Sequence, residues 1–286
     1  MKEKEFLSSL KSLDTEENID IHFYRRLGWM WANMARKLGI TPNAITIASI
    51  FIGVAAGVCF YSTNIWVNIG GLLLLILANS FDSADGQLAR MTKQYSRLGR
   101  ILDGLAGDMW FVSIYVSVCL RTVNTTALFA GNAWAIWSMA IVAGVCHIIQ
   151  AALADYYRQM HLQCVNGKSE LDNSASLREK LAESKGMSRV MMRLYLFYTL
   201  CQERIIPNVV ALQRRGTLPE EFRRESLPLM KYANALTFNW RSITLAVTLL
   251  CGNPWLYFVA EITLGNILLV YMVGRHERIC RRLLKA

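Results

Sequence analysis

Long uncharged segments alternate along the chain with short segments that carry its charge. Asp, Glu, Lys and Arg are all absent from residues 38–81, 122–154, 242–260 and 262–274. Roughly 20 helical residues cross a bilayer core about 30 Å thick, so the first segment is long enough for two membrane spans and the second for at least one. The pattern therefore predicts an all-α integral membrane protein with several spans.

We predict six transmembrane helices, separated by polar or turn-forming residues such as Ser62-Thr63-Asn64 and Gly252-Asn253-Pro254. Their expected bounds are 43–62, 67–88, 98–120, 132–157, 237–252 and 255–274. If the N-terminus is cytoplasmic, the loops on the opposite side contain a single basic residue, Arg121, of the 31 in the chain. Because basic residues concentrate in cytoplasmic loops, we predict a multi-pass protein with both termini in the cytoplasm.

Residues 22–38, which precede the first span, have the pattern of an amphipathic interfacial helix. Apolar residues recur there at helical spacing, whereas the basic residues occupy other faces: the apolar set is Phe23, Leu27, Met30, Trp31, Met34 and Leu38. Such a helix lies along the lipid headgroups, and a cytoplasmic cap on the helix bundle is the alternative. Thr41, as N-cap, and Pro42, at the first helical position, are predicted to begin the next helix.

Composition agrees with a membrane protein. Hydrophobic residues make up 53% of the chain and charged residues only 18%, yet the formal net charge is +10. High hydrophobicity argues against intrinsic disorder. The seven cysteines are scattered without a CxxC pair, which argues against a disulfide framework and a zinc site. The basic residues are expected to lie on one membrane face, and no nucleic-acid partner is expected.

Four aspartates are concentrated where two predicted spans meet. Asp82 and Asp85 are three residues apart, on one helical face at the end of the second span, and Asp103 and Asp108 lie near the start of the third. Charges in spans are costly and mark function by default, although an exposed acidic loop is the alternative. Oxygen ligands select hard divalent cations, and two such ions can clamp a phosphoryl group. We therefore predict a cytoplasmic metal centre.

The same segment resembles the CDP-alcohol phosphotransferase family. Its signature, D-x2-D-G-x2-A-R-x8-G-x3-D, is matched over residues 82–103 by Asp82, Asp85, Gly86, Ala89, Arg90, Gly99 and Asp103. Pro42-Asn43-Ala44-Ile45-Thr46 is similar to the P-N-x-[IL]-T stretch of the family's first span. The resemblance covers approximately residues 22–158.

The chain departs from this pattern at its last aspartate. The family's D-x3-D would place an aspartate at position 107, where this chain has Gly107, followed by Asp108. On an α-helix position 107 lies about 40° from Asp103, and Asp108 about 140° away. A π-bulge, made easier by Gly104 and Gly107, would return Asp108 to the site. We expect Asp108 to replace the missing aspartate; the alternative is that it pairs with another helix and leaves three carboxylates.

The resemblance implies a divalent-metal-dependent enzyme of phospholipid synthesis. Such an enzyme transfers a phosphatidyl group from CDP-diacylglycerol to a polar alcohol and releases CMP; inositol phosphate, inositol and glycerol phosphate are the expected acceptors. The implied metal ligands, for two Mg²⁺ or Mn²⁺ ions, are Asp82, Asp85, Asp103 and Asp108, with Asp108 also the catalytic base. The implied CDP-binding residues are Asn43, Thr46, Asp82, Gly86, Ala89, Arg90 and Gly99. A homodimer is also implied.

Four further residues are candidates for binding the acceptor. His147 lies on a polar face of the fourth span, and Arg158, Arg241 and Arg275 each stand at the cytoplasmic end of a span. Arginine forks suit phosphate, but packing by the histidine and ordinary anchoring by the arginines are the alternatives. Glu261, inside the last span, either pairs with a basic group or lines a cavity.

Other functions remain open at this point. A phosphocholine- or phosphoethanolamine-type transferase acting on diacylglycerol is the second hypothesis. A transporter is less favoured, because no inverted repeat is visible, and a catalytically silent family member is another alternative. The predicted organisation is a cytoplasmic tail (1–21), the interfacial helix (22–38), a catalytic four-helix part (39–158), a cytoplasmic insertion (159–236) and two last spans with a basic tail (237–286).

Overall fold

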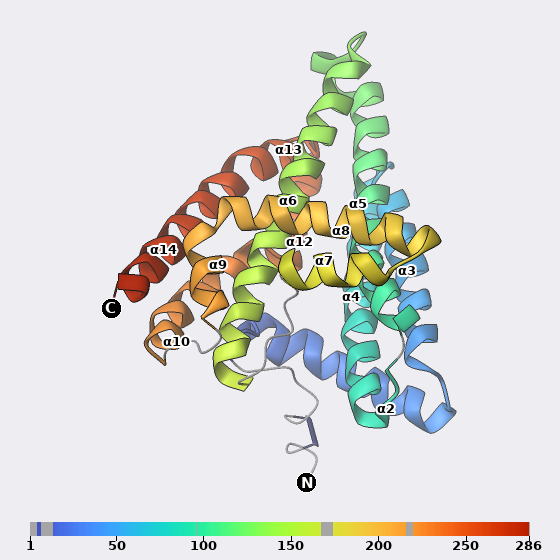
Figure 1. The fold of residues 1–286 in the computed structure, drawn as a ribbon. Helices are drawn as coiled ribbons and strands as arrows, with labels where there is room; N and C mark the ends of the chain where they lie inside the picture. The colour runs from blue at the N-terminus through green and yellow to red at the C-terminus, as the bar shows by residue number, and fades with distance from the viewer. Residues whose placement is uncertain (1–4, 7–13, 96, 167–173, 216–219, 286) are drawn as a thin grey trace. The chain divides into compact units, whose positions relative to one another are not determined.

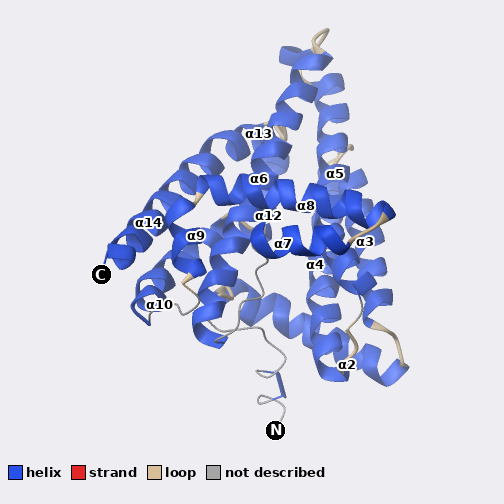
Figure 2. Ribbon diagram, viewed as in Figure 1, coloured by secondary structure: helices blue, strands red, loops and turns tan. Residues whose placement is uncertain are grey.

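The computed structural model describes the whole chain except residues 1–4, 7–13, 96, 167–173, 216–219 and 286. The described residues form helices joined by short loops and contain no strand (Figure 2). They divide into two compact units. The first unit is Met1–Gly144 with Arg241–Ile262, and the second is Val145–Trp240 with Thr263–Ala286.

The first unit is built around the long helices α3 (Pro42–Cys59), α4 (Ile65–Thr92) and α5 (Arg97–Thr125) (Figure 1). A π-helical turn, η1 (Asp20–Tyr24), leads into α2 (Arg25–Leu38), which precedes them. The remaining elements are η2 (Ala127–Phe129), the first part of α6 (Ala133–Asn166), most of α12 (Phe238–Leu250), α13 (Leu256–Ala260) and the start of the π-helical η4 (Glu261–Gly265).

The second unit holds the rest of α6 and the helices that follow it. These are α7 (Ser174–Glu183), α8 (Gly186–Ile205), α9 (Pro207–Arg214), α10 (Glu220–Ser226), η3 (Leu227–Leu229), α11 (Met230–Ala235) and α14 (Asn266–Lys285). Proline begins α9, and α8 ends two residues before Pro207. The Glu277 carboxylate accepts hydrogen bonds of 3.1 Å from the backbone N–H groups of Asn208 and Val209, and so caps the first turn of α9.

Small residues allow α3 to pack tightly against α4 and α5. A Cβ atom added to Gly53 would lie 2.2 Å from the Trp110 ring of α5, and one added to Gly57 would lie 2.4 Å from the Ser113 hydroxyl. Ser113 also donates a 2.9 Å hydrogen bond to the carbonyl of Val54. The start of α3 is as predicted: Thr41 caps the helix by accepting from the Ala44 N–H, and Pro42 occupies the first turn.

The segment predicted as an interfacial helix forms η1 and α2, and a narrow stripe of small residues fixes it to α4. Gly28, Ala32 and Ala35 are buried. A Cβ atom on Gly28 would lie 2.7 Å from the Ser83 hydroxyl of α4. Trp31 packs edge-on against Phe81, with ring centroids 5.2 Å apart. The larger apolar residues face outward instead, with Phe23, Met30, Met34 and Leu38 exposed by 45–67%.

Five helical segments in the described residues are long and apolar enough to cross a membrane. They are Pro42–Cys59, Ile65–Thr92, Leu102–Thr125, Ala133–Val165 and Leu256–Lys285. The sixth predicted span, 237–252, is represented by α12, which has 13 residues and is therefore about 20 Å long. A turn at Leu236 and Thr237 separates it from α11, and Gly252 ends it with a positive φ of 74°.

The tight contact of α3 with α5 is testable. Gly53→Ala is expected to lower the stability of the folded protein by about 1–3 kcal/mol, because the added methyl group overlaps the buried Trp110 ring. Gly70→Ala on α4 is the matched control, because its Cβ atom would meet nothing within 4 Å. Unfolding midpoints of the two variants in the same detergent measure the difference. Equal stability of both variants would contradict the packing described here.

Candidate active site

Three carboxylates gather at one end of the first unit. Asp82 and Asp85 come from the last three turns of α4 and Asp103 from the beginning of α5, and one oxygen atom of each lies within 4.8 Å of the others. Asp85 is buried, Asp82 half-buried and Asp103 exposed. The hairpin between the helices begins at Lys93, whose left-handed conformation (φ 55°) ends α4. The ends of α4 and α5 thus come together as predicted, and three of the four predicted aspartates lie in the cluster.

A third helix contacts this cluster through Thr46. The Thr46 hydroxyl, in the second turn of α3, hydrogen-bonds to Oδ2 of Asp85 and is 3.2 Å from the carbonyl of Pro42. Both side chains are almost fully buried, with 2% of Thr46 and 4% of Asp85 exposed. The hydrogen bond fixes the orientation of the Asp85 carboxylate, because little space is left for another rotamer.

The other residues of the signature lie at the same helix ends. Gly86, Ala89 and Arg90 are half-buried in the last turns of α4. The Arg90 guanidinium folds back along its own helix, so that Nη1 would lie 3.5 Å from a Cβ atom on Gly86. Gly99 is half-buried at the start of α5, and Asn43 is half-buried in the first turn of α3.

The donor set fits a hard divalent cation. Three carboxylates at this separation repel one another unless a positive charge lies between them. Their oxygen atoms are the ligands that Mg²⁺ and Mn²⁺ prefer. Asp82, Asp85 and Asp103 are therefore the residues that could hold a metal ion.

Asp108 is not part of this group. The helix α5 is a regular α-helix from Arg97 to Thr125, without the π-bulge that would turn Asp108 toward Asp103. Asp108 is exposed and lies on another face of the helix, as the 100° rotation per residue requires. The structure thus brings together three of the four predicted metal ligands.

A polar network behind the cluster was missed by the sequence analysis. Nη1 of Arg25, on α2, donates to the Ser83 hydroxyl at 3.2 Å, and Gln87 donates to the carbonyl of Arg25 at 2.9 Å. Nε of Arg25 also pairs with the buried carboxylate of Glu16 at 2.9 Å. Ser83 lies between two of the clustered aspartates in sequence. The signal that could have revealed the network is the Gly28, Ala32 and Ala35 stripe, which brings α2 against α4.

The predicted acceptor residues are divided between the two units. His147, Arg158 and Arg275 belong to the second unit and Arg241 to the first. His147 is 9% exposed, Arg158 pairs with Asp155 at 3.7 Å, and Arg275 is exposed. The polar face of α6 also has a packing role, because Gln150 donates to the Asn266 side chain at 3.1 Å.

Arg241 forms a buried ion pair, which answers the question left open for Glu261. Nε of Arg241 is 3.4 Å from Oε1 of Glu261, and each side chain is 5% exposed. Tyr257 donates its hydroxyl proton to the same oxygen at 2.9 Å. Burial of two charges requires such pairing, so this contact joins α12 to the α13–η4 segment.

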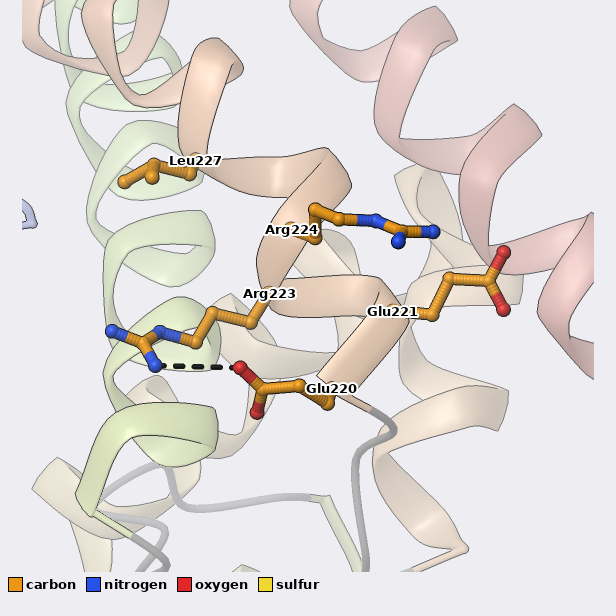
Figure 3. Close-up of a pocket in the computed structure, with 5 residues that line it drawn as sticks. All are labelled: Glu220, Glu221, Arg223, Arg224 and Leu227. Atoms are coloured by element: carbon orange, nitrogen blue, oxygen red, sulfur yellow. Dashed lines mark hydrogen bonds and ion pairs between the residues drawn. The ribbon is translucent and has the colours of Figure 1, made fainter.

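Two surface hollows formed by described residues of the second unit contain none of the predicted site residues. One, of about 520 Å³, is lined by Glu220, Glu221, Arg223, Arg224 and Leu227 (Figure 3). Arg223 and Glu220, three residues apart on α10, pair at 3.4 Å beside it. Another, of about 660 Å³, lies beside the Glu203 and Arg214 pair. The clustered aspartates remain the best-supported candidate for chemistry.

The contact of Thr46 with Asp85 gives a second prediction. Thr46→Val keeps the shape of the side chain but removes the hydroxyl, so Mn²⁺ affinity is expected to fall about 10-fold or more, as is typical when the partner of a metal ligand is lost. Thr46→Ser keeps the hydroxyl and is expected to bind as the wild type does. Titration of purified protein with Mn²⁺, followed by the electron paramagnetic resonance of the free ion, measures both. Unchanged affinity in Thr46→Val would contradict the prediction.

Comparison with known proteins agrees with the site. A segment of 84 residues is 36% identical to the archaetidylinositol phosphate synthase of Pyrococcus horikoshii, and it covers 29% of this chain and 43% of that protein. The chain thus matches less than half the length of this curated relative. The family model for CDP-alcohol phosphatidyltransferases matches residues 39–210, a range that contains Thr46 and the three clustered aspartates. The chain belongs to the CDP-alcohol phosphatidyltransferase family.

Proposed function

We propose that the protein transfers a phosphatidyl group from CDP-diacylglycerol to a polar alcohol and releases CMP. The observation that carries this proposal is the cluster of Asp82, Asp85 and Asp103, which lies inside the segment matched by the family. Three oxygen ligands at helix ends suit a reaction that needs a diphosphate to be bound and its charge neutralised.

In this proposal the three clustered aspartates hold Mg²⁺ or Mn²⁺, with two ions bound in the working enzyme. The metal ions would neutralise the charge of the diphosphate and of the departing CMP. Thr46 keeps the Asp85 carboxylate in its binding orientation. Asn43, Gly86, Ala89 and Gly99 are proposed to line the cytidine and phosphate positions, and Arg90 to donate to phosphate oxygens.

The transfer step requires a base for the acceptor hydroxyl. The acceptor oxygen forms a bond to the phosphorus attached to the lipid alcohol, while the bond from that phosphorus to the bridging oxygen breaks and CMP takes the electron pair. We assign the hydroxyl proton to Asp108, which lies five residues after Asp103, or about 7.5 Å along α5. A base must come within hydrogen-bond reach of the acceptor hydroxyl. Asp108 lies on another face of α5 than Asp103, so this assignment requires the acceptor to approach the cluster from that face.

A phosphorylated polyol is the proposed acceptor. The name of the Pyrococcus relative refers to an inositol phosphate headgroup, and arginine side chains at the ends of spans suit such an anion. His147, Arg158 and Arg275 are the proposed contacts. Arg241 is left out of these contacts, because its buried guanidinium is paired with Glu261.

The proposed membrane arrangement has six spans, with both termini and the active site on the cytoplasmic side. Five candidate spans and the apolar α12 support the number, and the distribution of basic residues supports the orientation. The outward-facing apolar residues of α2 support its place in the interface. Residues 39–158 would be the catalytic part, 159–236 an insertion, and two chains would form a homodimer.

Substrate use can be tested directly. Purified protein in lipid vesicles is incubated with CDP-diacylglycerol, Mg²⁺ and one acceptor at a time, namely inositol phosphate, inositol or glycerol phosphate. CMP release is expected with at least one acceptor and is expected to stop when the metal is chelated. CMP formation only from CDP-choline or CDP-ethanolamine with diacylglycerol would favour the alternative transferase. No CMP with any pair of substrates would contradict an enzymatic role.

The separate roles of two aspartates give another prediction. Asp108→Asn is expected to lower the transfer rate about 100-fold or more, which is the usual contribution of a general base, while Mn²⁺ binding stays unchanged. Asp103→Asn is expected to lose both transfer and metal binding. Turnover and Mn²⁺ titration are measured on the same preparations. Near-normal turnover of Asp108→Asn would show that Asp108 is not the base, and impaired metal binding would show that it is a ligand.

A further inference from the structure

One face of α8, in the second unit, is apolar and exposed. Val190 is 51% exposed and Phe197 68%, and Cys201 is also exposed. At 100° per residue these three side chains lie within about 40° of one another, whereas Thr199 lies about 180° from Val190. Thr199 is 3% exposed. The helix therefore packs on its unit with one side and presents an apolar stripe on the other.

Arginines accompany this stripe. Arg189, Arg193 and Arg204 are all exposed, and within the described part of the chain no hydrogen bond or ion pair is recorded for them. The single acidic residue of α8, Glu203, is engaged elsewhere, since its carboxylate accepts from the N–H and hydroxyl of Ser174 at 2.8 and 2.7 Å. The exposed face of α8 thus combines apolar side chains with positive charge that its own helix does not neutralise.

A hydrogen bond within the second unit joins the C-terminal end of α8 to α6. The Gln202 side chain of α8 donates to the carbonyl of Ala152 in α6 at 3.2 Å. Asp155, three residues further along α6, is the first charged residue after the uncharged segment 122–154. The C-terminal end of α8 therefore lies beside the part of α6 where the uncharged segment gives way to charged residues. An arginine in the middle of the helix argues against α8 as a span.

We propose that α8 lies in the headgroup layer of the bilayer, with its apolar stripe at the acyl-chain boundary and its arginines on the phosphates of anionic lipids. Apolar surface and cationic side chains on one helix are the combination that binds such a layer, and arginine side chains are long enough to extend to the phosphates. This inference goes beyond the transfer reaction. It makes α8, which is part of the segment 159–236, a lipid-binding surface.

Cys201 allows the proposal to be tested by fluorescence. A chain that keeps Cys201 and has its six other cysteines replaced is labelled with an environment-sensitive fluorophore and reconstituted in vesicles of phosphatidylcholine and phosphatidylglycerol (7:3). Lipids with a nitroxide near the headgroup are expected to quench the label several-fold more than aqueous iodide does. The control label, at Glu179→Cys on the polar face of α7 in a Cys201→Ser background, is expected to show the opposite preference.

Two results would overturn the proposal. Equal quenching of both labels by iodide would place the stripe in water. A label that neither iodide nor nitroxide lipids quench would be covered by protein. If dilution of the protein restores quenching by iodide, the covering partner is a second copy of the chain. If the single-cysteine chain does not fold, the native chain and its Cys201→Ser variant are labelled and compared, and their difference reports on position 201.

The role of the three arginines of α8 is tested with the same label at Cys201. In the chain with Arg189→Gln, Arg193→Gln and Arg204→Gln, quenching by nitroxide-labelled phosphatidylglycerol is expected to fall at least twofold, to the level given by nitroxide-labelled phosphatidylcholine. A preference for the anionic lipid that survives these substitutions would contradict the role of the arginines. Neither measurement depends on transferase activity, so a failure here is distinct from a failure of the proposed function.

Discussion

The mutual repulsion of three carboxylates is the constraint around which the first unit is built. Asp82, Asp85 and Asp103 have oxygen atoms within 4.8 Å of one another, so the surrounding helices must hold negative charges together. They do so by close packing: Gly53 and Gly57 bring α3 onto α5, and Thr46 hydrogen-bonds to Asp85. Repulsion among the three carboxylates costs free energy, and the favourable free energy of folding offsets this cost. The site is therefore already arranged to bind a divalent cation.

The helix α2 packs directly against the helix that carries two of these aspartates. Its small residues bring it against α4, and Arg25 contacts Ser83 directly behind the aspartates. Larger apolar side chains on the other side of α2 face outward. Packed side chains, rather than a flexible linker, therefore join α2 to the turn of α4 that carries Asp82 and Asp85.

Much of this could be predicted from the sequence, and the failures have physical causes. Uncharged segments revealed the long helices, and the fixed spacing of the aspartates revealed the cluster, because both depend on local periodicity. Asp108 was expected in the cluster only through a π-bulge, which no local pattern determines and which α5 does not contain. Apolar periodicity placed the large residues of α2 correctly on one face but did not show that Gly28 and Ala32 would form the packed side. The Arg241 and Glu261 pair joins residues 20 positions apart, beyond the reach of helical spacing.

The function proposed for this chain depends on Asp82, Asp85 and Asp103 forming a divalent metal centre. Anomalous diffraction from crystals grown with Mn²⁺ tests it most directly. Density is expected within about 2.0–2.3 Å of carboxylate oxygens of Asp82, Asp85 and Asp103, without a contact from Asp108. Manganese bound elsewhere, with no density at these three side chains, would contradict it.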